Sequence, residues 1–513
     1  MTHRRILSLI IPLVLVGCVD RPLEKVPPSQ VQESSYYFPQ TLEKDIDILF
    51  VIDNSKSMDD EQTNLAQNFP RLIDALRNPK LGPDGSGAPC SVGNTAGCRI
   101  PNVHIGVVST DLGIGMFDGG TSGCSVDGDG GRLQSQPRGS CVGPSAPFIR
   151  YIDGVTNIDD PSTANPVEQV KQAFSCIAQL GTNGCGYEHP LEAARRALNE
   201  KVNPGFLRKD AFLAVVIITD EDDCSAKNPQ LFDPNMADGH GFRCFDRGLH
   251  CNINGNTPGP RKDCRPIEDP DTSKQWLYPA TDYAAFFRGL KPAGRVIVSA
   301  IAGDTDSVVV GSDGSGPFLK WTSCEGKGHG LAAPAIRVKS VVDAFGAQGH
   351  FSTICTDNFG PALKQLGERI ITSLGGQCVS APPLTAMGGL VCQAGDALGQ
   401  DSAGAPVTCQ GGCLDQADCV VEQSGTDGAT QLVQRCEASK FDNPSDTDCG
   451  TLCPCWRLVP RPSECKAAQN GSPYGIQVLR KGEPAKGTVA LVRCATTPLT
   501  WGSPEMAAMP QCN

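Results

Sequence analysis

Three oxygen-bearing side chains lie on a turn that directly follows an apolar run of this chain. The run Ile48–Ile52 is continuously apolar, which is typical of a strand covered on both faces. Asp53, Ser55 and Ser57 follow it in a D-x-S-x-S pattern. Open α/β sheets bind ligands at the carboxyl ends of their strands, so this pattern indicates a ligand site. Its oxygen atoms and low charge suit a hard cation such as Mg²⁺, whereas an ordinary turn or helix cap is the alternative.

Two later segments carry side chains that would complete such a site. Phe212–Thr219 is a second apolar run and ends at Asp220, while Thr182 lies on a loop before a helical stretch that starts at Pro190. These three motifs, in this order, resemble the metal-ion-dependent adhesion site of the von Willebrand factor type A family. The resemblance covers residues 45–375 and implies the metal ligands Asp53, Ser55, Ser57, Thr182 and Asp220.

The same resemblance implies how the site would work. In that family the hydroxyls contact the metal directly, and the aspartates act largely through bound water. The cation, Mg²⁺ or else Mn²⁺ or Ca²⁺, then takes a carboxylate from a partner, which implies adhesion rather than hydrolysis. This chain departs from the family after Asp220, where Glu221, Asp222 and Asp223 stand in place of the usual glycine, so several acids compete for the role.

The pattern of apolar residues predicts the fold class. We expect strands and helices to alternate in a doubly wound, mainly parallel, Rossmann-like α/β sheet, as in the type A family. The expected strands cover residues 47–52, 103–110, 212–219 and 296–302. The expected helices cover residues 58–77, 166–180, 189–201, 281–290 and 357–374, and Pro70 should kink or break the first.

Domain boundaries follow from shifts in composition. We predict a signal peptide at 1–17, a lipidated tether at 18–44, a type A domain at 45–377 and a small cysteine-rich, β-rich domain at 378–513. The type A domain should carry long insertions at 78–102, 111–165 and 223–280, which are rich in Gly and Pro and hold cysteines.

The cysteines indicate an oxidising compartment. Without Cys18, 24 of the 25 cysteines remain, and this even number predicts a disulfide framework. No Cys-x-x-Cys occurs, which argues against a thioredoxin-like or zinc-ribbon site. Plausible local pairs are Cys90–Cys98, Cys124–Cys141 and Cys176–Cys185.

The N-terminus has the features of a targeting segment. Arg4 and Arg5 precede a short apolar run, and Leu15-Val-Gly-Cys18 resembles a bacterial lipobox, which implies that Cys18 receives lipid. The following Val19, rather than Asp, implies the outer membrane by the same resemblance. A plain secretory signal with an incidental cysteine is the alternative.

Other clusters have simpler explanations. Asp118, Asp127 and Asp129 resemble part of a calcium loop but lack its closing glutamate, so solvated turns are expected. His240, Cys244, His250 and Cys251 suggest zinc, but in an oxidising compartment the cysteines are expected to pair. No nucleophile elbow, Walker A loop or His-Glu-x-x-His motif occurs, so no enzyme is indicated.

The sequence therefore predicts a lipid-anchored envelope protein that binds a divalent cation and, through it, a protein or surface ligand. With a net charge of -12 and a pI of about 5.1, nucleic acid is not an expected partner. A structural envelope protein with a vestigial site and a metal-dependent hydrolase using Asp220–Asp223 are the alternatives.

The lipid anchor gives a first testable prediction. Cys18→Ser should abolish lipidation and release the protein from membranes, because stable attachment depends on the acyl chains. Metabolic labelling with palmitate measures this, and a labelled mutant would refute the lipobox assignment.

Overall fold

The computed structural model describes most of the chain from residue 31 onward. The described residues are 31–39, 44–91, 94–117, 123–138, 141–236, 239–292, 294–313, 316–325, 330–375, 378–379, 381–425, 429–442, 448–460, 465, 472–482, 484 and 488–512. The predicted signal peptide and Cys18 lie outside them. Within them, no helix is both long and apolar enough to cross a membrane.

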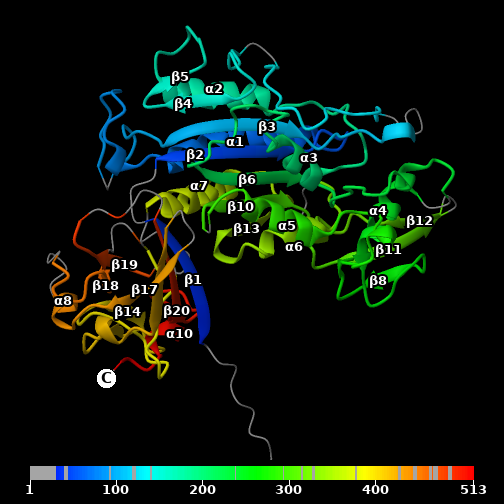
Figure 1. Cartoon of the computed structure of the whole chain (residues 1–513). Coiled ribbons are helices and arrows are strands. Elements are labelled where there is room, and N and C mark those ends of the chain that lie inside the picture. The colour runs from blue at the N-terminus through cyan, green and yellow to red at the C-terminus, as the bar shows by residue number, and fades with distance from the viewer. Residues whose placement is uncertain are drawn as a thin grey trace, which may run out of the picture.

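A seven-stranded sheet forms the centre of the first domain (Figure 1). Its strands are, in spatial order, β13 (Gly349–Thr353), β10 (Val296–Ala302), β6 (Phe212–Thr219), β2 (Asp45–Ile52), β3 (Asn102–Ser109), β4 (Ile149–Ile152) and β5 (Val155–Thr156). The first five strands run parallel to one another. Strand β4 is antiparallel to both of its neighbours, β3 and β5. The carboxyl ends of β2, β3 and β6 therefore meet at one edge of this sheet.

Helices pack on both faces of this sheet because β2 buries side chains on both. Ile48 and Phe50 lie in a core with α1 (Asp59–Ala75), α2 (Pro166–Ile177) and α7 (Gly360–Gly375). Leu49 and Val51 face a second core, with α3 (Pro190–Ala197), α5 (Ala280–Gly289) and α6 (Ile336–Asp343). The four central strands and the five helices predicted from sequence lie within a few residues of these bounds. Pro70 lies inside α1 without ending it.

The predicted fold class is nevertheless wrong for this chain, which does not form a doubly wound parallel Rossmann-like fold. Its sheets are mixed: the central sheet ends in an antiparallel hairpin, and most remaining strand pairs are antiparallel. The β4–β5 hairpin shows the reason. Asp153 and Gly154, both with positive φ, form a two-residue turn that returns the chain beside itself without a crossover helix.

The insertions also form structure that the sequence did not indicate. Between β6 and β10 the chain forms α4 (His240–Gly248), β7 (Leu249–His250), β8 (Gly259–Arg261) and β9 (Arg265–Pro266). Strand β8 pairs with β11 (Val308–Asp313), which also pairs with β12 (Gly316–Leu319), and β7 pairs with β9. All of these pairs are antiparallel.

A six-stranded sheet forms most of the C-terminal region (Figure 1). Its strands are, in spatial order, β1 (Gln32–Pro39), β20 (Val489–Thr496), β16 (Cys419–Ser424), β17 (Thr430–Arg435), β18 (Cys455–Pro460) and β19 (Tyr474–Leu479). Smaller elements beside it are β14 (Ala397–Gln400), β15 (Pro406–Thr408), α8 (Ser439–Asp442) and α10 (Pro504–Ala507).

Strand β1 lies in the segment predicted as a tether, and this part of it is not a free linker. Tyr36 and Phe38 alternate with more exposed neighbours, and both are buried in the C-terminal core. Strand β1 also contacts α7, so it joins the C-terminal sheet to the first domain. The exact domain boundaries stay a prediction.

Twelve disulfides join the 24 cysteines of the described residues, which confirms the predicted framework. Cys90–Cys98 is confirmed. The other two predicted local pairs are wrong, because the chain instead forms Cys124–Cys185 and Cys141–Cys176. These bonds link the insertion after β3 to the last turn of α2 and to the segment between α2 and α3, a proximity that arises only in the folded chain.

This exchange of partners can be tested on the intact protein. Mass spectrometry of a non-reduced digest should recover Cys124 bonded to Cys185 and Cys141 bonded to Cys176. A peptide in which Cys124 is bonded to Cys141 would contradict the structure. Few thiols should be alkylated after denaturation without reductant.

Candidate functional site

The candidate site begins at the turn that leaves β2. The Asp53 side chain is fully buried, and one of its oxygens accepts a hydrogen bond from the Ser55 N–H at 2.8 Å. The other oxygen accepts one from the Thr219 hydroxyl, also at 2.8 Å. The Ser55 and Ser57 hydroxyl oxygens are 3.3 Å apart. Because Ser57 is exposed, this pair of hydroxyls is reachable from solvent.

The loop that carries Thr182 is attached to this turn on both sides. The Gln62 side chain, on α1, donates to the carbonyls of Asp53 and Gly181 and accepts the Gly181 N–H. The Gly184 N–H donates to the Asn54 carbonyl at 2.8 Å. A Cβ atom at residue 184 would collide with the Asn54 side chain, so glycine is required for this approach. The loop that carries Thr182 therefore lies beside the D-x-S-x-S turn, and a ligand role for Thr182 stays a prediction.

The four acids after β6 separate into two pairs with different surroundings. Asp222 accepts the N–H groups of Arg337 and Val338 at the start of α6, and Asp223 forms a 3.1 Å ion pair with Arg337. Asp222 and Asp223 therefore hold α6 in place. Asp220 is buried, and neither of its carboxylate oxygens has a hydrogen-bond partner among the described residues. Asp220 is thus the one of the four whose two carboxylate oxygens are both buried and without a hydrogen-bond partner in the described part of the chain.

Other buried polar atoms without partners gather at the same edge of the sheet. In the part of the chain that the structure describes, they include oxygens of Asn54, Glu61, Thr110, Glu188 and Asp220. Buried polar groups in folded proteins are normally hydrogen-bonded, so such a group of unpaired oxygens requires an explanation. A bound cation with its water molecules would satisfy them.

The charges at this edge are of one sign. Burial, followed by the nearby carboxylates of Asp53 and Glu221, raises the pKa of Asp220 well above its ordinary value. Burial and the Asp53 carboxylate raise the pKa of Glu221 to about 7. Burial also raises the pKa of Asp53. These carboxyls therefore take up protons unless a cation compensates their charge.

The donor set fits a hard cation. Within the described ranges, no group of three or more His, Cys, Asp or Glu side chains is placed to hold a metal ion. The predicted site is of another kind, because Ser55, Ser57 and Thr182 contribute hydroxyls. Hydroxyl, carboxylate and water oxygens suit Mg²⁺, Mn²⁺ or Ca²⁺, and the unpaired oxygens of Asp220 give them a place to bind.

Glu188 is the residue at this edge that sequence reasoning missed. Glu188 lies two residues before Pro190, the first residue of α3. Its side chain is 1% exposed and lies beside Glu221. Burial and the neighbouring Glu221 and Asp53 carboxylates raise the pKa of Glu188 well above its ordinary value. The only signal in the sequence is its place shortly after Thr182, because its approach to Glu221 depends on folding.

Among the described residues, the other clusters considered from sequence form turns or disulfides. Asp129 accepts a hydrogen bond from the Ser109 hydroxyl at 2.6 Å, and the Asp127 carbonyl accepts the Gly130 N–H, so both serve a turn. Asp118 lies outside the described residues. Cys244 is bonded to Cys224 and Cys251 to Cys264, so neither is available to zinc.

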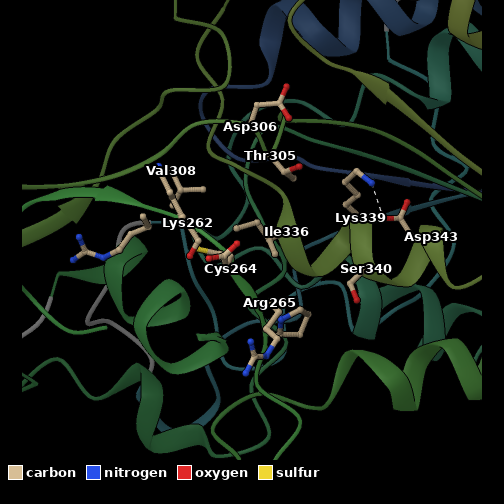
Figure 2. A pocket seen from close by; sticks show the side chains of 13 residues that line it. Lys262, Cys264, Arg265, Thr305, Asp306, Val308, Ile336, Lys339, Ser340 and Asp343 are labelled. Atoms are coloured by element: carbon tan, nitrogen blue, oxygen red, sulfur yellow. Dashed lines mark hydrogen bonds and ion pairs between the residues drawn. The ribbon is translucent and has the colours of Figure 1, made fainter. Parts of the chain in front are cut away.

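A cavity of about 600 Å³ lies elsewhere, between β8–β9 and α6 (Figure 2). Some of its charged groups already have protein partners: Lys339 pairs with Asp343 at 2.6 Å, and the Arg261 guanidinium donates to backbone carbonyls. None of the predicted site residues lines it. We therefore place the candidate site at the acidic edge rather than in the larger cavity.

No protein-family model and no curated protein matches this chain. Similar solved structures include the pilus adhesin SpaC from Lactobacillus rhamnosus GG, with 11% identity, a TM-score of 0.29, and coverage of 91% of this chain and 41% of that one. The minor pilin PilB from Streptococcus sanguinis has 11% identity, a TM-score of 0.26, and coverage of 65% and 61%.

A third similar structure is the pilus adhesin RrgA from Streptococcus pneumoniae, with 11% identity, a TM-score of 0.24, and coverage of 90% of this chain and 58% of that one. The alignments span less than two thirds of the length of each of these three proteins.

The geometry predicts unequal effects of two substitutions on Mg²⁺ binding. Asp53→Ala should weaken it about 10- to 100-fold, because the carboxylate supplies charge and would orient bound water. Thr182→Ala should weaken it less, since it removes one neutral oxygen. Isothermal titration calorimetry measures both affinities, with circular dichroism to establish folding.

Asp60→Ala is the matched control, because Asp60 is an exposed carboxylate in the first turn of α1. It should titrate Mg²⁺ as the wild type does. If folded Asp53→Ala also titrates like the wild type, residues 53–57 form only a turn.

Proposed function

We propose that this chain is a cell-envelope adhesion protein whose candidate site is a cation-dependent adhesion site of the von Willebrand factor type A kind. The observation that carries the proposal is the set of buried, unpaired oxygens around Asp220, next to two hydroxyls that face one another at a solvent-accessible turn. The residues that would hold the cation are Asp53, Ser55, Ser57, Thr182 and Asp220. Mg²⁺ is the proposed ion, with Mn²⁺ or Ca²⁺ as substitutes.

When bound, the cation would supply an open coordination position for a carboxylate of a protein or surface ligand. The chain's own residues prepare this place. Asp53 fixes the turn through the Ser55 N–H, and Thr219 fixes Asp53 in turn. Gln62 holds the Thr182 loop against the same turn. The hydroxyl of Ser57, which is exposed, is the member of the set nearest to solvent.

Binding rather than catalysis is the activity we propose. The acids that a hydrolase alternative would use are divided in their roles, since Asp222 and Asp223 are bonded to Arg337 and the start of α6. A lipid at Cys18, as the lipobox resemblance implies, would hold the chain at the membrane, with the outer membrane as the proposed location. The net charge of -12 favours a protein or surface ligand over nucleic acid.

Capture from an envelope extract tests this proposal. The immobilised full chain should retain a partner in Mg²⁺ and lose it in EDTA, because a partner carboxylate would be held through the cation. Ser57→Ala in Mg²⁺ should retain about as little as the wild type in EDTA, since it removes an exposed hydroxyl of the site.

Ser86→Ala is the control, because Ser86 is also an exposed turn serine but lies outside the site, in the insertion at residues 78–102. It should retain the partner in Mg²⁺. Partner binding that persists in EDTA would overturn the proposal, and the absence of any metal-dependent partner would favour a structural role with a vestigial site.

A further inference from the structure

Glu188 lies next to the candidate site, and none of the interactions described above explains why its carboxylate is buried. Its side chain is 1% exposed, and its Oε1 atom has no hydrogen-bond partner among the described residues. Its carbonyl accepts the Cys224 N–H at 2.8 Å, which ties the start of α3 to the segment after β6. The Glu188 carboxylate is thereby held beside that of Glu221.

The charge at this edge exceeds what one divalent cation neutralises. Asp53, Asp220, Glu221 and Glu188 are four carboxylates, and none of them forms an ion pair with Lys or Arg in the described part of the chain. One divalent cation at the Asp53 turn would leave two of these four negative charges uncompensated. Buried charge without a counter-charge is strongly unfavourable, so a second positive group is expected.

A small cavity lies where such a group would fit. It measures about 30 Å³ and is lined by Glu188, Glu221 and Asp222 together with the Cys224–Cys244 disulfide. About 10–15 Å³ measured in this way is enough to hold one water molecule, so this cavity has room for about two. The space admits one ion with few of its own water molecules.

Disulfide bonds restrain the two segments that carry these glutamates. Cys185, three residues before Glu188, is bonded to Cys124, and Cys224, three residues after Glu221, is bonded to Cys244. Rigid support of this kind is what a preformed ion site requires, because the ligands do not have to be ordered when the ion binds.

We propose that Glu188 and Glu221 hold a second divalent cation, Ca²⁺, beside the cation of the Asp53 turn. Two carboxylates offer four oxygens, and Ca²⁺ accepts carboxylates in either binding mode with flexible geometry, whereas Mg²⁺ keeps several waters and needs more room. This second site deepens the proposed function. It rests on that proposal only for the cation bound at the neighbouring Asp53 turn.

A shared proton between Glu188 and Glu221 is the competing explanation, and a count of bound ions separates the two. Equilibrium dialysis of the full chain with radioactive Ca²⁺ should find about two ions per wild-type chain. Glu188→Gln keeps the shape of the side chain and a hydrogen-bond donor but removes the charge, so it should bind about one ion. Glu221→Gln should show the same loss.

Two controls make the outcome specific. Glu192→Gln changes a different buried glutamate, which lies in α3 and is ion-paired with Arg195 and Arg196, so this variant should keep both ions. Asp53→Ala should lose the ion of the turn and keep the one at Glu188. A wild-type chain that binds no ion, or folded Glu188→Gln and Glu221→Gln variants that bind as many ions as the wild type, would overturn the second site.

These outcomes distinguish the two proposals. If Asp53→Ala keeps both ions while Glu188→Gln loses one, the proposed adhesion site fails and the second site stands. If Asp53→Ala loses one ion and Glu188→Gln loses none, the second site fails and the adhesion site stands.

Discussion

The carboxylate of Asp53 is buried at the end of a central strand and is held by neutral donors, the Ser55 N–H and the Thr219 hydroxyl. Taking an ionised carboxylate out of water costs several kcal/mol unless an opposite charge compensates it. Asp220 and Glu221 add charge of the same sign nearby, and burial, followed by repulsion from Asp53, raises the pKa of both carboxyls. A cation bound at this edge would supply the opposite charge that these carboxylates lack.

The opposite end of the same strand shows how this chain treats a buried carboxylate that needs no ligand. Asp47 is as deeply buried as Asp53, but Arg208 Nε lies 2.7 Å from one of its oxygens, and Lys291 is also near. Asp223 is likewise paired with Arg337. Since arginine compensates buried acids elsewhere in this fold, its absence from Asp53, Asp220 and Glu188 among the described residues supports a ligand role for these three.

Two of the disulfides lie at this edge of the sheet. Cys124–Cys185 attaches the insertion after β3 to the Thr182 loop, and Cys224–Cys244 attaches α4 to the segment after β6. Both bonds close loops that leave the carboxyl ends of strands. Cross-links of this kind restrict the unfolded chain and also fix the loops that carry ligand oxygens.

The sequence by itself determined the central strands, most helices and the even cysteine count, because each depends on local periodicity or on residue type, and it named the five candidate site residues, whose role stays a prediction. Only the tertiary structure decided the rest. Antiparallel pairing of β4 and β5 and of the C-terminal strands replaced the expected doubly wound sheet, since pairing depends on turns and on partners far along the chain. The approach of Glu188 to Glu221, the separation of Asp220 from Asp223, and the exchange of cysteine partners likewise arise from contacts between distant segments, which local sequence patterns do not encode.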